Sequence, residues 1–284
     1  MSVPFLKMNG LGNDFVVLDA RARPVPMTEA AAARIADRLE GVGCDQVIVI
    51  EPPRGPADAF LRIYNQDGGE VAACGNASRC IAELLFAETG KDTVVLETAA
   101  GLLHCIPAEG GVTVDMGAPK FDWQDIPLAE RMDTRTLDIK LGPIDKPVLF
   151  GPSAVNVGNP HCIFFVDDVA AHALDRFGPL IENHPLFPQR TNVSLAQVVK
   201  PDVIRLRVWE RGVGITLACG TAACAVVPAA VRRQLASRKA SVLLDGGALL
   251  IEWREANDHI TMTGPTSLDY EDVLDDSYFK DFIS

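Results

Sequence analysis

The sequence predicts an α+β protein made of two homologous domains, each a mostly antiparallel sheet or barrel around an apolar central helix. Three observations predict this fold class. A Cys-Gly motif occurs twice, further motifs recur around it in the same order, and short apolar runs alternate with turn residues in both halves. The chain of 284 residues is long enough for two domains of ordinary size.

A duplication is visible in the spacing of the repeated motifs. Cys219 follows Cys74 by 145 positions, and the other pairs are 145 or 146 positions apart. These pairs are Gly12-Asn13 with Gly158-Asn159, Gln46 with Asn192, Tyr64-Asn65 with Trp209-Glu210, and 116–119 with 262–265. We therefore predict an N-terminal domain of residues 1–119, to which residues 266–284 return, and a C-terminal domain of residues 120–265 that begins with a connector.

Local patterns predict the strands and helices of each half. Runs rich in Val, Ile, Leu and Phe, bounded by turn residues, predict strands at 15–18, 47–50, 94–97, 162–166 and 242–244. An amphipathic segment predicts a helix over 28–39 with Thr28 as its N-cap. Apolar segments directly after the two cysteines predict helices over 76–88 and 221–236. Pro228 should kink the last helix or remove one of its backbone hydrogen bonds.

Charge and hydropathy exclude several classes of protein. The formal net charge is −12, with 48% hydrophobic and 23% charged residues, so the surface should repel nucleic acid and anionic membranes. No apolar run reaches the roughly 18–20 residues that span a bilayer, and the N-terminus lacks the pattern of a secretory signal. We expect a cytoplasmic protein that binds neither nucleic acid nor a membrane.

The cysteines indicate reduced thiols rather than a disulfide framework. There are seven, an odd number, in a chain long enough to fold without covalent cross-links. They lie at positions 44, 74, 80, 105, 162, 219 and 224. Their spacings match no common zinc pattern, so no metal site is expected.

Cys74 and Cys219 each precede a glycine that opens a predicted helix. A helix N-terminus presents unpaired N–H groups and the positive end of the dipole, which bind a carboxylate and favour a thiolate nearby. Two facing domains would place the active site in the cleft between them, with one thiol on each side of a substrate carbon. One thiolate could remove a proton there while the other thiol returns one, which inverts the stereocentre. The alternative is a small buried hydrophobic residue, as we expect for the other five cysteines.

Six motifs resemble those of the diaminopimelate epimerase family. They occur in family order between residue 7 and residue 265, which is nearly the whole chain, and together they are highly specific. The motifs are Lys7 to Phe15, Gly41 to Gln46, Cys74-Gly75-Asn76, Gly158 to Cys162, Trp209 to Gly212, and Ala218 to Thr221.

The resemblance implies interconversion of LL- and meso-2,6-diaminopimelate on the bacterial route to lysine and peptidoglycan, with no pyridoxal phosphate and no metal. In the LL-to-meso direction it makes Cys219 the proton acceptor and Cys74 the donor. It assigns the reacting carboxylate to Gly75, Asn76, Gly220 and Thr221. It assigns the lining of the substrate cleft to Asn13, Gln46, Asn65, Asn159 and Asn192.

The resemblance also gives roles to charged residues. His161 and Glu210 would tune the thiols or orient the substrate. Arg211 can hold the distal carboxylate of diaminopimelate in a bidentate pair, and Glu210 can accept from its distal ammonium. Tyr270 matches a position that supports a homodimer in the family, so we expect a homodimer.

Each of these residues has a structural alternative. Asn13 and Asn159 could be turn residues, Glu210 and Arg211 a solvated pair, and His161 a buried structural histidine. Rival functions within the same build are a proline or hydroxyproline racemase and a phenazine-type isomerase. A rival from another class is an amino-acid-binding or thiol redox protein, in which the two cysteines could form a disulfide.

The chain departs from the family pattern at a few positions. Ala77 and Ala222 stand where many members have Gly, and Ala favours a helix by about 1 kcal/mol over Gly, so we expect both to be tolerated. Ile215 stands where Glu is common, which removes a charge close to Cys219. Ser78 and Pro228 are lesser departures.

Overall fold

The computed structural model describes residues 2–143 and 145–280. The chain divides into two compact units. The first unit contains the residues up to Val114 and those from Thr263 onward, and the second unit is Asp115–Met262. The predicted boundaries, at 119 and 265, are the ends of the two repeated halves of the sequence, and they remain a prediction. In the structure, residues 115–119 belong to the second unit and residues 263–265 belong to the first.

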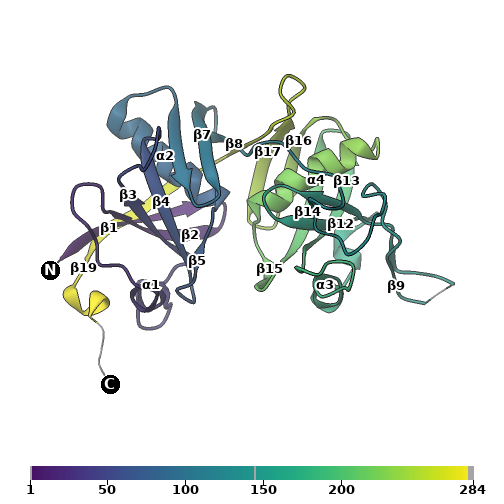
Figure 1. The fold of residues 1–284 in the computed structure, drawn as a ribbon, viewed down its shortest axis with the longest axis horizontal. Coiled ribbons are helices and arrows are strands. Elements are labelled where there is room, and N and C mark those ends of the chain that lie inside the picture. The colour runs from purple at the N-terminus through teal and green to yellow at the C-terminus, as the bar shows by residue number, and fades with distance from the viewer. Residues whose placement is uncertain (1, 144, 281–284) are drawn as a thin grey trace. The chain divides into compact units, whose positions relative to one another are not determined.

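The first unit is a mixed sheet with two helices and a short 3₁₀ helix (Figure 1). Most neighbouring strands are antiparallel, whereas β2 pairs with β3 and β4 pairs with β6 in parallel. The C-terminal strand β19 pairs with β1. In chain order the elements are β1 (Val3–Gly10), β2 (Asn13–Asp19), α1 (Glu29–Ala36), β3 (Gln46–Glu51), β4 (Ala59–Asn65), β5 (Glu70–Val71), α2 (Gly75–Thr89), β6 (Val94–Thr98), β7 (Gly101–Ala108), β8 (Gly111–Asp115), β19 (Ser267–Leu274) and η2 (Asp276–Phe279).

From β11 to β18 the second unit repeats the order of β1 to β8, and it adds β9, β10 and η1. Here β12 pairs with β13 and β14 pairs with β16 in parallel, which are the counterparts of the two parallel pairs in the first unit. The elements are β9 (Lys140–Leu141), β10 (Leu149–Phe150), β11 (Ser153–Asn156), β12 (Pro160–Phe165), η1 (Val169–Ala171), α3 (Leu174–Glu182), β13 (Asn192–Lys200), β14 (Val203–Glu210), β15 (Gly214–Thr216), α4 (Gly220–Arg232), β16 (Lys239–Leu244), β17 (Gly247–Trp253) and β18 (Ile260–Gly264).

The strand registers confirm the duplication. Phe15 stands opposite Gln46 across β2 and β3, and His161 stands opposite Asn192 across β12 and β13. The second pair is the first one moved by 146 positions, the offset seen in the motifs. The predicted fold class, two homologous α+β domains, is therefore confirmed.

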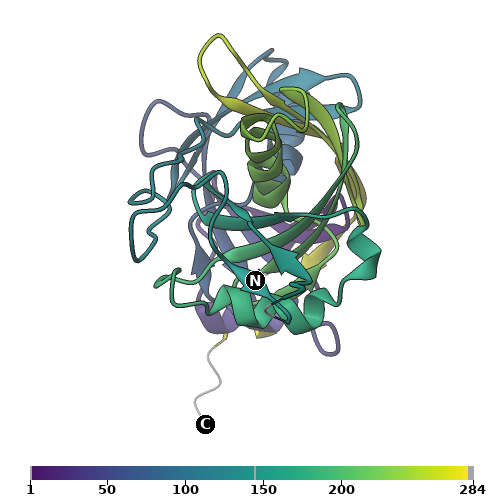
Figure 2. The same cartoon turned by 90° about the vertical axis from the view of Figure 1, so that its right-hand side faces the viewer.

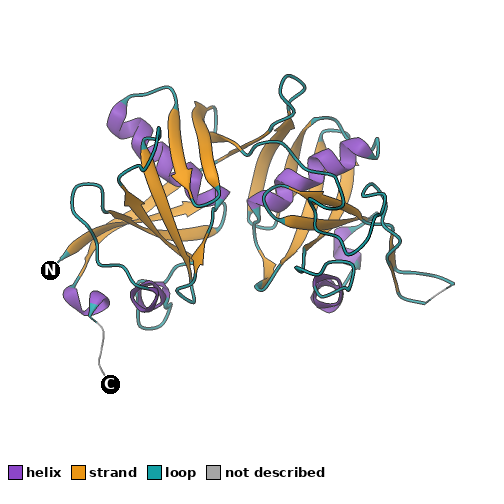
Figure 3. Ribbon diagram, in the orientation of Figure 1, coloured by secondary structure: helices purple, strands orange, loops and turns teal. Residues whose placement is uncertain are grey.

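The helices that follow Cys74 and Cys219 are the apolar centres of their units (Figure 3). Helix α2 packs against β1, β6 and β7, and α4 packs against β11, β12, β13, β16 and β17. Ten of the residues of α4 are buried, and the helix lies inside the curved sheet of its unit (Figure 2). Burial on all sides explains the continuous apolar sequence of this helix.

The predicted helix ends differ from the observed ones by a few residues. Helix α4 runs unbroken through Pro228 and ends at Arg232, because Gln234 just beyond it adopts a left-handed conformation (φ 61°). Helix α1 ends at Ala36 rather than at 39, and its predicted N-cap is confirmed, since Thr28 accepts from the Ala31 N–H. Helix α2 ends at Thr89, and its C-cap, Gly90, has the left-handed φ of 66° that commonly terminates a helix.

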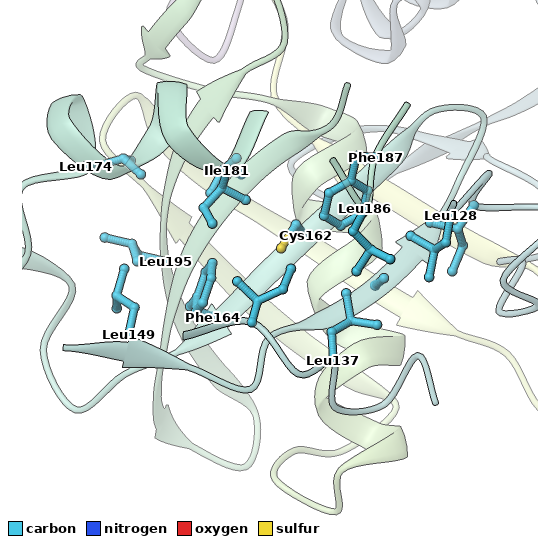
Figure 4. Packing of buried hydrophobic residues seen from close by; sticks show 14 of the residues in the cluster. Leu128, Leu137, Leu149, Cys162, Phe164, Leu174, Ile181, Leu186, Phe187 and Leu195 are labelled. Carbon is cyan, nitrogen blue, oxygen red and sulfur yellow. The ribbon is translucent and has the colours of Figure 1, made fainter. Parts of the chain in front are cut away.

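Each unit has a hydrophobic core of its own. In the second unit, Phe164 and Cys162 of β12 pack with Ile181 of α3 and with Leu195 of β13 (Figure 4). In the first unit, α1 covers the strands through Ile35. Among the helices of the described part of the chain, none is both long and apolar enough to cross a membrane.

Candidate active site

Cys74 and Cys219 occupy the same local structure in the two units. Each is the N-cap of the buried helix, with φ and ψ of −144° and 114° at Cys74 and of −132° and 109° at Cys219. Neither side chain makes a capping hydrogen bond to its helix. The first turn of each helix therefore presents backbone N–H groups, which is the setting expected for binding an anion.

The two thiols differ in their surroundings. Cys74 is partly exposed, whereas Cys219 is buried, with its Sγ 3.4 Å from the Thr221 hydroxyl. Burial and then the Glu210 carboxylate raise the pKa of Cys219 well above its usual value, and the Thr221 hydroxyl only partly offsets them. The expectation that the helix start favours a thiolate is therefore wrong for Cys219 in this structure, because burial and a neighbouring negative charge outweigh the helix N-terminus.

The other cysteines are structural, as predicted. All seven side chains are thiols rather than halves of a disulfide, and the remaining five have no exposed surface. Burial raises the pKa of Cys44 to about 11 and those of Cys80 and Cys105 to about 12. These side chains act as small hydrophobic residues.

In the first unit, the predicted amide side chains form two hydrogen-bonded pairs. Asn76, the second residue of α2, donates from Nδ2 to Asn13 Oδ1 at 2.6 Å. Gln46 of β3 donates from Nε2 to Asn65 Oδ1 at 2.9 Å, while its Oε1 is buried without a partner. Asn13 thus lies at the start of α2, and Gln46 retains a buried acceptor for a ligand.

Charged residues hold these amides in place. Asn13 donates to Asp45 Oδ2 at 3.2 Å, and Arg38 Nη2 binds Asp45 Oδ1 at 2.8 Å. Arg38 and Lys7 both bind Asp14. Burial alone would raise the pKa of the Asp14 carboxyl, but the two cations lower it by more, so this pKa lies well below its usual range. The Asp45 carboxylate, itself held by Arg38, therefore fixes the orientation of the Asn13 amide.

In the second unit, His161 and Asn159 make the corresponding pair. His161 Nε2 lies 2.8 Å from Asn159 Oδ1, and with the amide so oriented Nε2 carries the proton. His161 Nδ1 is buried without a hydrogen-bond partner. Burial, and then the positive charge of Arg211, lower the pKa of His161 to about 3, so the imidazole is neutral at physiological pH.

Glu210 and Arg211 lie where β14 ends and the chain turns towards β15. Thr216 donates to Glu210 Oε1 at 2.5 Å, and the Val213 N–H donates to the Glu210 carbonyl at 3.1 Å, which closes the turn. Asn192 Oδ1 accepts from the Arg211 N–H at 2.9 Å and its Nδ2 donates to the Pro160 carbonyl. Asn192 thus ties β12 and the turn together through backbone groups.

The Arg211 guanidinium is available for an anion. It donates from Nη1 to the Gln189 carbonyl at 3.0 Å, and within residues 2–143 and 145–280 no carboxylate lies within salt-bridge distance of it. The alternative of a solvated Glu210–Arg211 ion pair is therefore not what the structure contains. A cation without a protein counter-ion, beside a neutral imidazole, suits a carboxylate ligand.

In the first unit, Gly75 and Asn76 directly follow Cys74, and Asn76 binds Asn13, whereas Gln46 and Asn65 bind each other. Asn159, His161, Asn192, Glu210, Arg211, Gly220 and Thr221 lie near Cys219 in the second. Within the described residues no group of three or more His, Cys, Asp or Glu side chains is placed to hold a metal ion.

Several supporting residues were missed from the sequence. Asp45, Arg38 and Arg79 hold the amides of the first unit, with Arg79 Nη1 donating to Asn76 Oδ1 at 2.9 Å. Glu182 and Thr216 hold the turn that carries Glu210 in the second unit. Asp45 directly precedes Gln46, and this proximity was a usable signal, whereas Glu182 and Thr216 have none in the sequence.

The family model and the curated relatives that match this chain name the same family. The diaminopimelate epimerase family model matches residues 5–121 and 153–268, one match in each half. Curated relatives named diaminopimelate epimerase, from Nitrobacter hamburgensis and Rhodopseudomonas palustris, are each 54% identical and cover 97% of this chain and 96% of their own. A solved phenazine biosynthesis protein of Bacillus anthracis has a TM-score of 0.68 at 17% identity, covers 96% of this chain and 99% of its own, and shows the fold alone. Because the family model matches most of the chain and relatives 54% identical align with 97% of it, the chain belongs to the diaminopimelate epimerase family of isomerases.

Proposed function

We propose that this protein interconverts LL- and meso-2,6-diaminopimelate in the cytoplasm, in the synthesis of lysine and peptidoglycan precursors, without a cofactor. The observation that carries the proposal is the repeated cysteine N-cap. Cys74 and Cys219 stand at the same position of two copies of one domain, each at an N-terminus able to bind a carboxylate. Family membership supplies the substrate.

The proposed chemistry is a pair of proton transfers at one α-carbon. In the LL-to-meso direction, the Cys219 thiolate takes the α-proton and the Cys74 thiol gives one to the opposite face, so that Cys219 ends as the thiol and Cys74 as the thiolate. Proton exchange with solvent restores the starting state. Because positioned acid–base catalysis contributes only about 10²–10⁴-fold, the helix N–H groups must also stabilise the charge that develops on the carboxylate.

The raised pKa of Cys219 fits a thiolate that forms when substrate arrives. In the free protein, burial and the Glu210 carboxylate oppose ionisation of this thiol. The substrate brings an ammonium group, which can neutralise Glu210 and so lower the thiol pKa. The free enzyme would then hold Cys219 as a thiol, which resists oxidation and alkylation better than a thiolate does.

The substrate has an amino acid group at each end, and only one end is inverted. We assign its distal carboxylate to Arg211, whose guanidinium has no protein counter-ion among the described residues. Amino acids that lack the second end would leave this cation unpaired, and this should discriminate against them.

Isotope exchange tests the proposal. LL-diaminopimelate in deuterated, reducing buffer without added cofactor should gain deuterium at one α-carbon with inversion. Cys74→Ser and Cys219→Ser should lose about 10²–10⁴-fold of this activity, whereas Cys105→Ala, a buried thiol of β7, should retain it. L-Proline and trans-4-hydroxy-L-proline should not exchange. No exchange of LL-diaminopimelate by the fully reduced parent protein would rule the proposal out.

We also propose that the active form is a homodimer. Strand β19 pairs with β1 and exposes seven of its eight residues. Leu268, Tyr270 and Val273 on this strand are 45–52% exposed, which is unusual for large apolar side chains on one strand. Light scattering should give twice the 30.5 kDa chain mass, and Tyr270→Asp should shift the protein towards the monomer.

A further inference from the structure

Glu182, the last residue of α3, is a buried acid to which the proposed reaction gives no role. Its exposed fraction is 5%, and buried carboxylates are rare unless paired. Three donors satisfy it. Oε2 accepts from the Trp209 indole Nε1 at 2.7 Å, and Oε1 accepts from the Gly212 N–H at 2.9 Å and from Arg190 Nη1 at 3.1 Å.

Two of these donors flank the functional turn. Trp209 directly precedes Glu210, and Gly212 directly follows Arg211. The Glu182 carboxylate therefore binds the residue on each side of this pair, through the Trp209 indole and the Gly212 backbone N–H. Gly212 has a φ of 78°, a conformation that favours glycine and gives the turn its shape. The position of this carboxylate therefore fixes the backbone from which Arg211 extends.

Helix α3 is fitted closely to this turn. A Cβ at Gly178 would lie 2.5 Å from the Trp209 ring, so only glycine allows the helix to approach. The Arg211 N–H is held from another side by Asn192 Oδ1. Glu182 and Asn192 thus hold the turn from two elements, α3 and β13.

We propose that Glu182 is a positioning residue that orients the Glu210–Arg211 turn and thereby sets selectivity for a substrate with a distal carboxylate. This inference rests on the proposed function, because it uses Arg211 as the binder of that carboxylate. Glu182 makes no contact with substrate and acts through the turn.

A carboxylate is required at this position, and an amide does not replace it. All three partners are N–H donors, and they occupy both oxygens. In Glu182→Gln one of the two oxygens becomes an NH₂ group, which faces a donor whichever way the amide is turned. Glu182→Gln therefore loses at least one hydrogen bond without changing the size of the side chain.

The test is a double-mutant cycle on kinetics with LL-diaminopimelate. Glu182→Gln should raise KM about tenfold while kcat changes less than threefold, as expected for loss of binding geometry. In an Arg211→Lys background the same change should raise KM less than threefold, because the bidentate contact is already gone. Arg190→Gln removes the exposed third partner and should raise KM about threefold. Asp58→Asn is the matched control, since Asp58 binds Lys91 and the Val95 N–H in the first unit, and the KM of this variant should not change.

Hydrogen exchange gives a readout that needs no substrate. The amides of Arg211 and Gly212 should exchange faster in Glu182→Gln than in the parent protein or in Asp58→Asn. An inactive parent protein would refute the proposed function, while faster exchange at these amides would still support the positioning role. Three results would each overturn the inference. The first is an unchanged KM in both Glu182→Gln and Arg190→Gln. The others are an equal effect of Glu182→Gln on KM with Arg211 and with Lys at position 211, and an unchanged hydrogen-exchange rate of the turn amides.

Discussion

The buried neutral imidazole of His161 should make the stability of the second unit depend on pH. Its pKa is about 3 in the folded protein, against a usual value of 6.5. Above pH 6.5 both states carry a neutral imidazole. Below pH 6.5 the imidazole binds a proton in the unfolded chain but not in the folded protein. The free energy of unfolding therefore falls by about 1.4 kcal/mol per pH unit until about pH 3. Between pH 7.5 and pH 5 this one group should remove about 2 kcal/mol.

The second unit can be followed separately because of where its tryptophans lie. The chain has three, Trp123, Trp209 and Trp253, and all belong to the second unit. Urea unfolding monitored by tryptophan fluorescence should therefore report this unit, which avoids treating a two-unit chain as one transition. The free energy of unfolding would be measured at several pH values for the parent protein and for His161→Gln.

The difference between the two proteins is the decisive quantity. His161→Gln should be less stable at pH 7.5, because it disturbs a fully buried site, but the gap should narrow by about 2 kcal/mol by pH 5. His104→Gln, on the exposed surface of β7, should follow the parent protein at every pH. Parallel curves for the parent and His161→Gln would refute the argument, since they would mean that His161 accepts its proton equally in both states.

Two further variants test the site. Glu210→Gln should lower the pKa of Cys219, because it removes a carboxylate that opposes ionisation, and iodoacetamide should then label Cys219 faster at pH 8 in a Cys74→Ser background, as read by mass spectrometry. An unchanged labelling rate would contradict this electrostatic role. Asp45→Ala should raise KM for LL-diaminopimelate about tenfold, since Asn13 loses the acceptor that orients its amide, and an unchanged KM would show that Asn13 is held without it.

The fold was predictable because the signals that define it are local or repeated. The two Cys-Gly motifs marked the helix starts, which the structure confirms at Gly75 and Gly220. The common offset revealed the duplication that short strands alone could not show. Thr28 was recognisable as an N-cap because capping uses a side chain only three residues from its partner.

Helix α3 was missed because its sequence argues against a helix. It contains Gly178 and Pro179, both of which disfavour a helix interior. Its stability comes instead from tertiary contacts, in which Gly178 lies against Trp209 and Glu182 binds the turn beyond it. Contacts of this kind join residues that are distant in the sequence and leave no periodic trace in it.

The electrostatics of the candidate site residues could not be predicted from the sequence. A helix N-terminus suggested a lowered thiol pKa at Cys219, yet burial and Glu210 raise it. Likewise the sequence could not show that His161 is buried deeply enough to stay neutral. Both properties depend on how much water reaches the group, which is decided by the packing of the whole unit.

At Cys74 and Cys219, the N-cap positions of α2 and α4, the residue that best suits the proposed reaction differs from the residue that best stabilises the helix. Serine is among the strongest N-cap residues, while the cysteines found there make no capping bond to their helices. Replacing either thiol with a hydroxyl should therefore strengthen the helix while it abolishes the proposed proton transfer. Folding alone would favour serine at both positions, so the proposed proton transfer explains why each position holds a thiol at the expense of a helix cap.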